Sequence, residues 1–154
     1  MSRWLSMLCL TLGTATGLPG CAAYHLRGVV VPGETPGMFA LENDDTQLNR
    51  PGLDGAVLQL TLDPSAMHPK SLGSVTTDKH GKFDVPIDAI GAGMFEYELE
   101  IVCRAAGYKS QLAKMPLPSA KRQLLIRMQP GRDTGPLRPD TMQETLEMSE
   151  HLLK

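Results

Sequence analysis

The stretch Thr76-Thr77-Asp78-Lys79-His80-Gly81-Lys82-Phe83 decides the fold, because it is a polar turn between two segments with strand character. Asp at the first corner and Gly at the fourth suit a type I turn whose last residue has a positive φ, which is typical of a bulged β-hairpin. After the turn, Phe83, Val85 and Ile87 alternate with polar residues and Pro86. The alternation predicts a half-buried strand, and Pro86 predicts that this strand lies at a sheet edge.

Outward from this turn, short segments with period-two alternation recur, separated by Gly and Pro. In the clearest of them Phe95, Tyr97, Leu99, Ile101 and Cys103 share one face. The segments 24–31, 55–63, 72–77, 82–87, 95–104, 109–115 and 123–129 are the expected strands. Turn signals spaced so regularly predict an all-β sandwich of six or seven strands.

The connection from Gly33 to Asp54 is unusually long for a compact domain. It is acidic and holds one apolar group, Met38-Phe39-Ala40-Leu41. Connections of this length are more often functional or mobile than idle. Two interpretations stay open: a surface loop that folds back over its own apolar cluster, or a binding loop in which the segment 34–54 with Met38 and Phe39 contacts a ligand.

The first twenty residues have the organisation of a secretory signal. Met1-Ser2-Arg3 supplies one positive charge, and Trp4 to Thr16 is apolar or small with no acid or base. This run is shorter than the about 20 apolar residues that a membrane-spanning helix needs.

Leu18-Pro19-Gly20-Cys21 resembles the lipobox of bacterial lipoproteins. The resemblance implies cleavage before Cys21, followed by a diacylglyceryl thioether and an acylated amino terminus, with palmitate-type chains, on that residue. Two acyl chains already give stable attachment, so this would be a membrane-anchored protein. Ala22 implies, by similarity to enterobacterial sorting, passage to the outer membrane. The alternative is ordinary secretion with Cys21 as a chance residue.

The cysteines permit no intramolecular disulfide in the mature chain. On this resemblance Cys9 would leave with the signal and Cys21 would carry lipid, so Cys103 alone would remain, and the alternation points it into the core. Its predicted burial argues against a nucleophilic role. No nucleophile elbow is present, and we expect a protein that is not an enzyme.

We expect no metal site, no cofactor and no nucleic-acid partner. The histidines at 25, 68, 80 and 151 lack metal-ligand spacing. The formal net charge is −2, and no basic stripe is visible. Glu96, Glu98 and Glu100 form a row on one strand face, which is either a solvated outer face or a place for a cation. We expect the solvated face, because metal sites usually draw ligands from several elements.

Three short motifs in order carry a family resemblance. Leu53-Asp54-Gly55-Ala56-Val57, the Thr76 to Phe83 turn and Ala106-Gly107-Tyr108-Lys109 are similar to motifs of the carboxypeptidase regulatory-like domain. The resemblance implies a transthyretin-like (prealbumin-like) β-sandwich that is an accessory module without catalysis. No enzyme domain accompanies it here, so a partner, an envelope protein or a carbohydrate, would act in trans.

The sequence therefore predicts four parts: a lipoprotein signal peptide at 1–20, a lipid anchor and tether at 21–25, the sandwich at 26–131, and a linker with a helix at 132–154. In the last part Thr141-Met142-Gln143-Glu144 fits a capping box, and Met142, Leu146, Ser149 and Leu153 recur at helical spacing. We expect an envelope lipoprotein, facing the periplasm or the cell surface, that is a binding or structural module. The alternative is a subunit of an envelope assembly, like the outer-membrane lipoproteins of type VI secretion.

Overall fold

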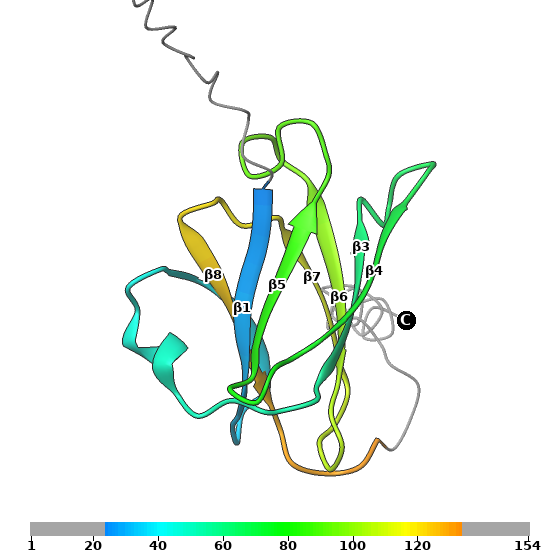
Figure 1. Ribbon diagram of the computed structural model, residues 1–154. Coiled ribbons are helices and arrows are strands. Elements are labelled where there is room, and N and C mark those ends of the chain that lie inside the picture. The colour runs from blue at the N-terminus through cyan, green and yellow to red at the C-terminus, as the bar shows by residue number, and fades with distance from the viewer. Residues whose placement is uncertain (1–23, 134–154) are drawn as a thin grey trace, which may run out of the picture.

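The computed structural model describes residues 24–133, which form an all-β sandwich of two four-stranded sheets (Figure 1). One sheet has the strand order β2-β8-β1-β5 and the other β4-β3-β6-β7. Only β1 and β8 pair in parallel; the remaining pairs within the two sheets are antiparallel. The strands are β1 Tyr24–Pro32, β2 Gly37–Glu42, β3 Val57–Leu62, β4 Lys70–Thr76, β5 Lys82–Ile87, β6 Glu98–Arg104, β7 Gln111–Pro116 and β8 Arg122–Met128.

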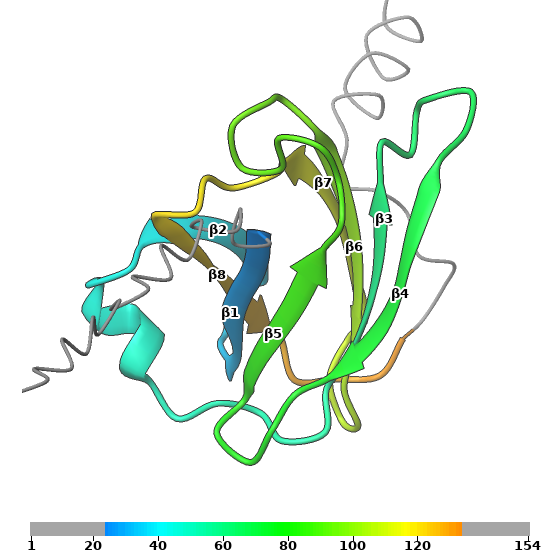
Figure 2. The same cartoon turned by 45° about the horizontal axis from the view of Figure 1, so that its top comes forward.

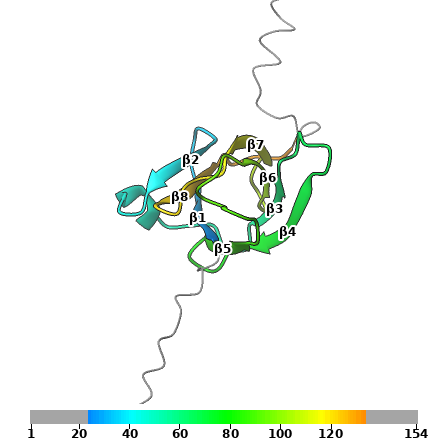
Figure 3. The same cartoon turned by 90° about the horizontal axis from the view of Figure 1, so that it is seen from above.

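The main core lies between the two sheets, which face each other as two layers when the molecule is seen from above (Figure 3). Alternate residues of nearly every strand point into it, because successive side chains of a strand face opposite ways. The largest fully buried members include Leu26, Leu58, Leu60, Ile87, Leu99, Ile101, Leu124, Ile126 and Met128. Apolar burial of this extent is the main stabilising contribution to the sandwich.

A second, smaller core covers the outer face of the first sheet. Val29, Val31 and Leu125 meet Leu48, which comes from the single-turn 3-10 helix η1, Thr46–Asn49. Strands β1 and β8 are therefore apolar on both faces where η1 covers them. This cover explains why the sequence of β1 reads as a continuous Val run and not as an alternation.

The Asp78 turn forms as expected, but the predicted hairpin pairing is wrong. Gly81 N donates to Asp78 O (2.8 Å), Asp78 N donates to Lys82 O (2.9 Å), and Gly81 has φ +74°. Strands β4 and β5, however, belong to different sheets, and Figure 2 shows them diverging from the turn. Strand β5 pairs with β1, while Thr77 N bonds to Ala56 O beside β3. The turn thus links the two layers of the sandwich.

The strand count of six or seven is also corrected, to eight. The extra strand is β2, inside the connection expected to be a loop from Gly33 to Asp54. It pairs along its length with β8, and Met38 and Ala40 pack against the main core. The apolar group in this connection therefore belongs to a half-buried strand. It packs on the domain, as in the interpretation in which the connection folds back, but as a strand and not as a loop.

The prediction for the β6 region is partly right. Leu99, Ile101 and Cys103 are fully buried, as expected. Strand β6 begins only at Glu98, and Phe95, expected on the buried face, lies exposed in the preceding loop. Gly91 and Gly93, both at positive φ, turn the backbone just before it, and Phe95 N donates to Gly91 O (2.9 Å), so Phe95 still belongs to this turn. Pro86 lies on β5, an edge strand, as predicted.

The predicted signal peptide, Cys21 and the helix expected after Thr141 lie outside the described residues. Tyr24 and His25, which the sequence placed both in the tether at 21–25 and in the expected strand 24–31, are the first residues of β1. The Tyr24 hydroxyl donates to Pro118 O (2.6 Å), which fixes the start of the sandwich. Between residues 24 and 133 there is no helix with the length and hydropathy to span a bilayer.

Candidate functional site: a basic pocket at the interlayer turn

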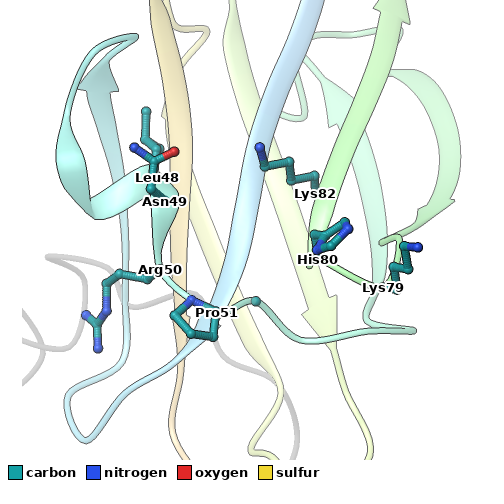
Figure 4. A pocket seen from close by; sticks show the side chains of 8 residues that line it. Leu48, Asn49, Arg50, Pro51, Lys79, His80 and Lys82 are labelled. Carbon is teal, nitrogen blue, oxygen red and sulfur yellow. The ribbon is translucent and has the colours of Figure 1, made fainter.

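An open pocket of about 520 Å³ separates the end of η1 from the Asp78 turn (Figure 4). Its lining contains one arginine, two lysines and one histidine, and no carboxylate. The lining residues are Leu48, Asn49, Arg50, Pro51, Gly52, Lys79, His80 and Lys82. Chemistry of this kind favours an anionic ligand.

One wall is held in place by a short capped turn. Asp45 Oδ1 accepts a hydrogen bond from Gln47 N (2.8 Å), which caps η1 at its amino end. Leu48 then inserts its side chain into the second core. The buried leucine fixes the direction of the chain, so that Asn49 and Arg50 follow it on the surface.

At the floor of the pocket, two backbone segments approach each other closely. This approach requires glycine at positions 52 and 81. A Cβ on Gly52 would lie 2.1 Å from His80 O, and a Cβ on Gly81 would lie 2.5 Å from Gly52 Cα. Beside this contact Leu53 N donates to Val30 O (2.7 Å) and Val30 N donates to Gly81 O (2.8 Å). Real Cβ contacts are essentially never so short, so the floor is closed to any larger residue at either position.

Thr77 joins the floor to the turn. Its buried hydroxyl donates to Leu53 O (2.6 Å) and accepts from Ala56 N (2.9 Å). These two bonds satisfy backbone groups that have no strand partner at this point, which is a requirement for buried backbone. The segment 53–56 and the Asp78 turn therefore form one unit.

The opposite wall comes from the turn itself. Asp78 Oδ1 accepts the N–H groups of His80 (2.8 Å) and Lys82 (2.9 Å). These backbone bonds, that from Lys82 contributing most, lower the pKa of the Asp78 carboxyl below its ordinary value. Because this carboxylate turns toward the backbone, it is not part of the lining. Figure 4 shows Lys82 and Asn49 on opposite sides of the pocket, with Arg50 pointing away from both.

Several cationic side chains that lack a partner elsewhere in the described domain line this pocket. Within the part of the chain that the structure describes, most Lys and Arg side chains have an ion pair, a hydrogen bond or a cation–π contact. Those without such a contact among residues 24–133 are Arg50, Lys79, Lys82, Lys121 and Arg132. Three of these five line the pocket. Of these three side chains, that of Arg50 points away from Lys82 and Asn49 (Figure 4).

The 33–54 segment is acidic, which suggested a binding loop, but two of its acidic residues have structural roles. Glu42 forms an ion pair with Arg122 (3.0 Å), and Asp45 caps η1. The Phe39 ring lies under the Arg127 guanidinium at 4.4 Å, away from the pocket. The segment does contribute to a candidate site, but through residues 48–52 and with the opposite charge.

The row of glutamates on β6 does not stay together as a site. Glu98 accepts from Ser65 Oγ (2.9 Å), and Glu100 lies 3.6 Å from Lys114 Nζ. Glu96 precedes the strand. No group of three or more potential metal ligands occurs among residues 24–133.

Two other residues considered from the sequence have structural surroundings. Burial raises the pKa of the Cys103 thiol to about 12, and the side chain is fully enclosed. His25 Nδ1 lies 2.5 Å from Asp84 Oδ1, on the outer face of the β1–β5 pair. Of the three histidines between residues 24 and 133, only His80 lines the basic pocket.

Compared with protein-family models, curated proteins and solved structures, the chain matches none.

Proposed function

We propose that this protein is a bacterial envelope lipoprotein whose sandwich is a non-catalytic binding module, and that the basic pocket is its binding site for an anionic group. The fold proposed for it is the transthyretin-like sandwich of carboxypeptidase regulatory-like domains. In support, two of the three family-like motifs, at Leu53 to Val57 and at the Asp78 turn, are bonded together through Thr77. The third lies at the β6–β7 turn, where Gly107 has φ +82°.

The observation that carries the functional proposal is the concentration of unpaired cations in one pocket. An exposed cation without a counter-ion gains little within the fold, so three of them around one pocket are better explained by a ligand. Phosphate and carboxylate are the anionic groups that Lys and Arg bind in proteins. An envelope carbohydrate bearing such groups fits the expected partner in trans.

The anchor and the pocket would lie at opposite ends of the sandwich. Strand β1 begins at Tyr24, only three residues after Cys21, whereas Val30 lies at the pocket floor. Six residues of strand span about 20 Å. A lipid on Cys21 would therefore present the pocket away from the anchoring membrane.

Titration of the purified full-length chain with inorganic pyrophosphate and with polygalacturonate tests the pocket. The variant Lys79→Gln with Lys82→Gln should bind about tenfold more weakly, since each exposed charge pair contributes up to about 1 kcal/mol. The matched control is Lys121→Gln with Arg132→Gln, which removes the same charge from two sites outside the pocket that also lack a side-chain partner among residues 24–133. Equal weakening in both variants, or no binding by the wild type, would refute the pocket assignment.

Membrane fractionation tests the anchor separately. The wild-type protein should sediment with membranes, and Cys21→Ala should be released from them, because the acyl chains supply the attachment. Retention of Cys21→Ala in membranes would contradict lipidation as the cause.

A further inference from the structure

Large exposed apolar side chains gather at the end of the sandwich where β1 begins. Ile90, Met94 and Phe95 in the β5–β6 loop are 89%, 86% and 61% exposed, and Met67 in the β3–β4 loop is 90% exposed. Figures 1 and 2 show both loops at the end where β1 begins. Elsewhere in the described chain the exposed large apolar residues are Phe39 and Val57, each under 40% exposed.

The β5–β6 loop presents these side chains on a defined backbone. Met94 N donates to Gly91 O (2.9 Å), and the Tyr97 hydroxyl donates to Ile90 O (2.7 Å). Ala92 packs against the main core. The loop is thus bonded to itself and seated on the domain, while its largest apolar side chains point outward.

The same loop lies directly against the first residue of the sandwich. A Cβ placed on Gly93 would be 2.6 Å from the Tyr24 ring. Three Cα–Cα steps separate Tyr24 from Cys21, and three trans steps of 3.8 Å reach at most about 11 Å. A lipid on Cys21 would hold this loop at the surface of its own membrane.

We propose that Ile90, Met94 and Phe95, with Met67, form a surface that inserts into the interface of the bilayer to which the protein is anchored. This inference rests on the proposed lipid anchor, which brings the bilayer within reach. An exposed apolar cluster rimmed by polar groups is typical of an interaction surface.

The neighbouring charges limit the depth of insertion. Asp88 and Glu96 flank the apolar residues, His68 follows Met67, and Lys70 Nζ donates to Asp88 O at the base of the two loops. Charged groups are costly in the hydrocarbon region, so they would stay among the headgroups while the apolar tips reach the acyl boundary. The contact is therefore interfacial.

A single tryptophan can report on this contact. Trp4 is the only tryptophan of the chain and lies in the predicted signal, so Phe95→Trp places one reporter in the mature protein. The matched control is Phe39→Trp, at a 38%-exposed position on the outer face of β2. Both lipidated proteins are reconstituted into vesicles of phosphatidylethanolamine and phosphatidylglycerol, with and without brominated acyl chains.

Brominated lipid should quench the Phe95→Trp emission at least twofold and leave the Phe39→Trp emission unchanged. Adding Ile90→Ser and Met94→Ser to Phe95→Trp should reduce that quenching, because less apolar area then enters the interface. Equal quenching at both reporter positions, or no quenching at position 95 in protein that floats with the vesicles, would overturn the proposal. Shielding of position 95 from aqueous iodide without lipid quenching would also overturn it and indicate a protein contact.

Flotation separates this inference from the proposed function. Wild-type protein that fails to float with the vesicles contradicts the anchor itself. Protein that floats through its anchor but shows no lipid quenching at position 95 contradicts only the apolar contact surface.

Discussion

Replacing Gly81 by alanine tests the backbone contact on which the fold and the pocket floor depend. Gly81 has φ +74°, and the left-handed conformation costs an L-residue about 1–2 kcal/mol. The added Cβ would also lie 2.5–2.6 Å from Gly52 Cα, Leu53 N and Val30 O, which are backbone atoms. Overpacking of this kind costs about 1–3 kcal/mol, so we expect Gly81→Ala to lower the free energy of unfolding by about 3 kcal/mol.

Urea unfolding followed by circular dichroism measures this loss, and Gly107→Ala is its matched control. Gly107 also has a positive φ (+82°), but a Cβ there would meet nothing within 4 Å. The control should lose only about 1 kcal/mol, the cost of the left-handed conformation. If the two variants lose the same free energy, the close approach of Gly52 and Gly81 does not limit the residue at position 81, and the reasoning about the floor is wrong.

Three further predictions concern stability. Thr77→Val should destabilise by about 2–3 kcal/mol in urea unfolding, because it leaves a buried N–H and C=O without partners, while Thr77→Ser should keep both bonds and lose less than about 1 kcal/mol. Gly52→Ala should destabilise although its φ is not positive, since its Cβ would lie 2.1 Å from His80 O; wild-type stability would exclude that overlap. Burial raises the pKa values of Tyr24 and Cys103 to about 12, above those of the unfolded chain. The stability should therefore be full below about pH 9 and fall as the pH rises toward 12, and Tyr24→Phe should make this fall shallower in a pH series of urea midpoints.

Local turn chemistry was predictable from the sequence, whereas the pairing of its flanks was not. Asp78 and Gly81 specify the turn through bonds that span four residues, and the structure shows those bonds. The choice between a hairpin and a step between layers depends on Thr77 and Ala56, which are 21 residues apart. Pairing therefore follows from long-range burial, which a local pattern does not contain.

Strand β2 was missed because its signal is weak. Gly37 is its first residue, and the flanking Gly, Pro and Asn residues are typical of a loop. The segment is a strand because it pairs with β8. The overextension of β6 to Phe95 has a related cause, since the alternation begins at Phe95, whose N–H is still bonded to Gly91 O within the preceding turn. Strand boundaries depend on such tertiary effects more than on the residues themselves.

The candidate pocket could not be predicted from the sequence, because its lining residues come from two segments that are far apart in the chain. Arg50 and Lys79 lie 29 residues apart in the sequence, and they line the same pocket because Gly52 packs on Gly81. Two acidic residues of the connection have structural partners at the surface, since Glu42 pairs with Arg122 and Asp45 caps η1. The glycines at positions 52 and 81 were the sequence feature that could have indicated this contact, but no local pattern relates these two positions to each other.

Intact mass spectrometry of the protein extracted from membranes tests the proposed envelope anchor most directly. We expect a polypeptide that begins at Cys21, with a diacylglyceryl thioether on its sulfur and a third acyl chain on its amino terminus. A mature chain with an unmodified Cys21, or one that begins at another residue, would contradict the anchor and the orientation inferred from it.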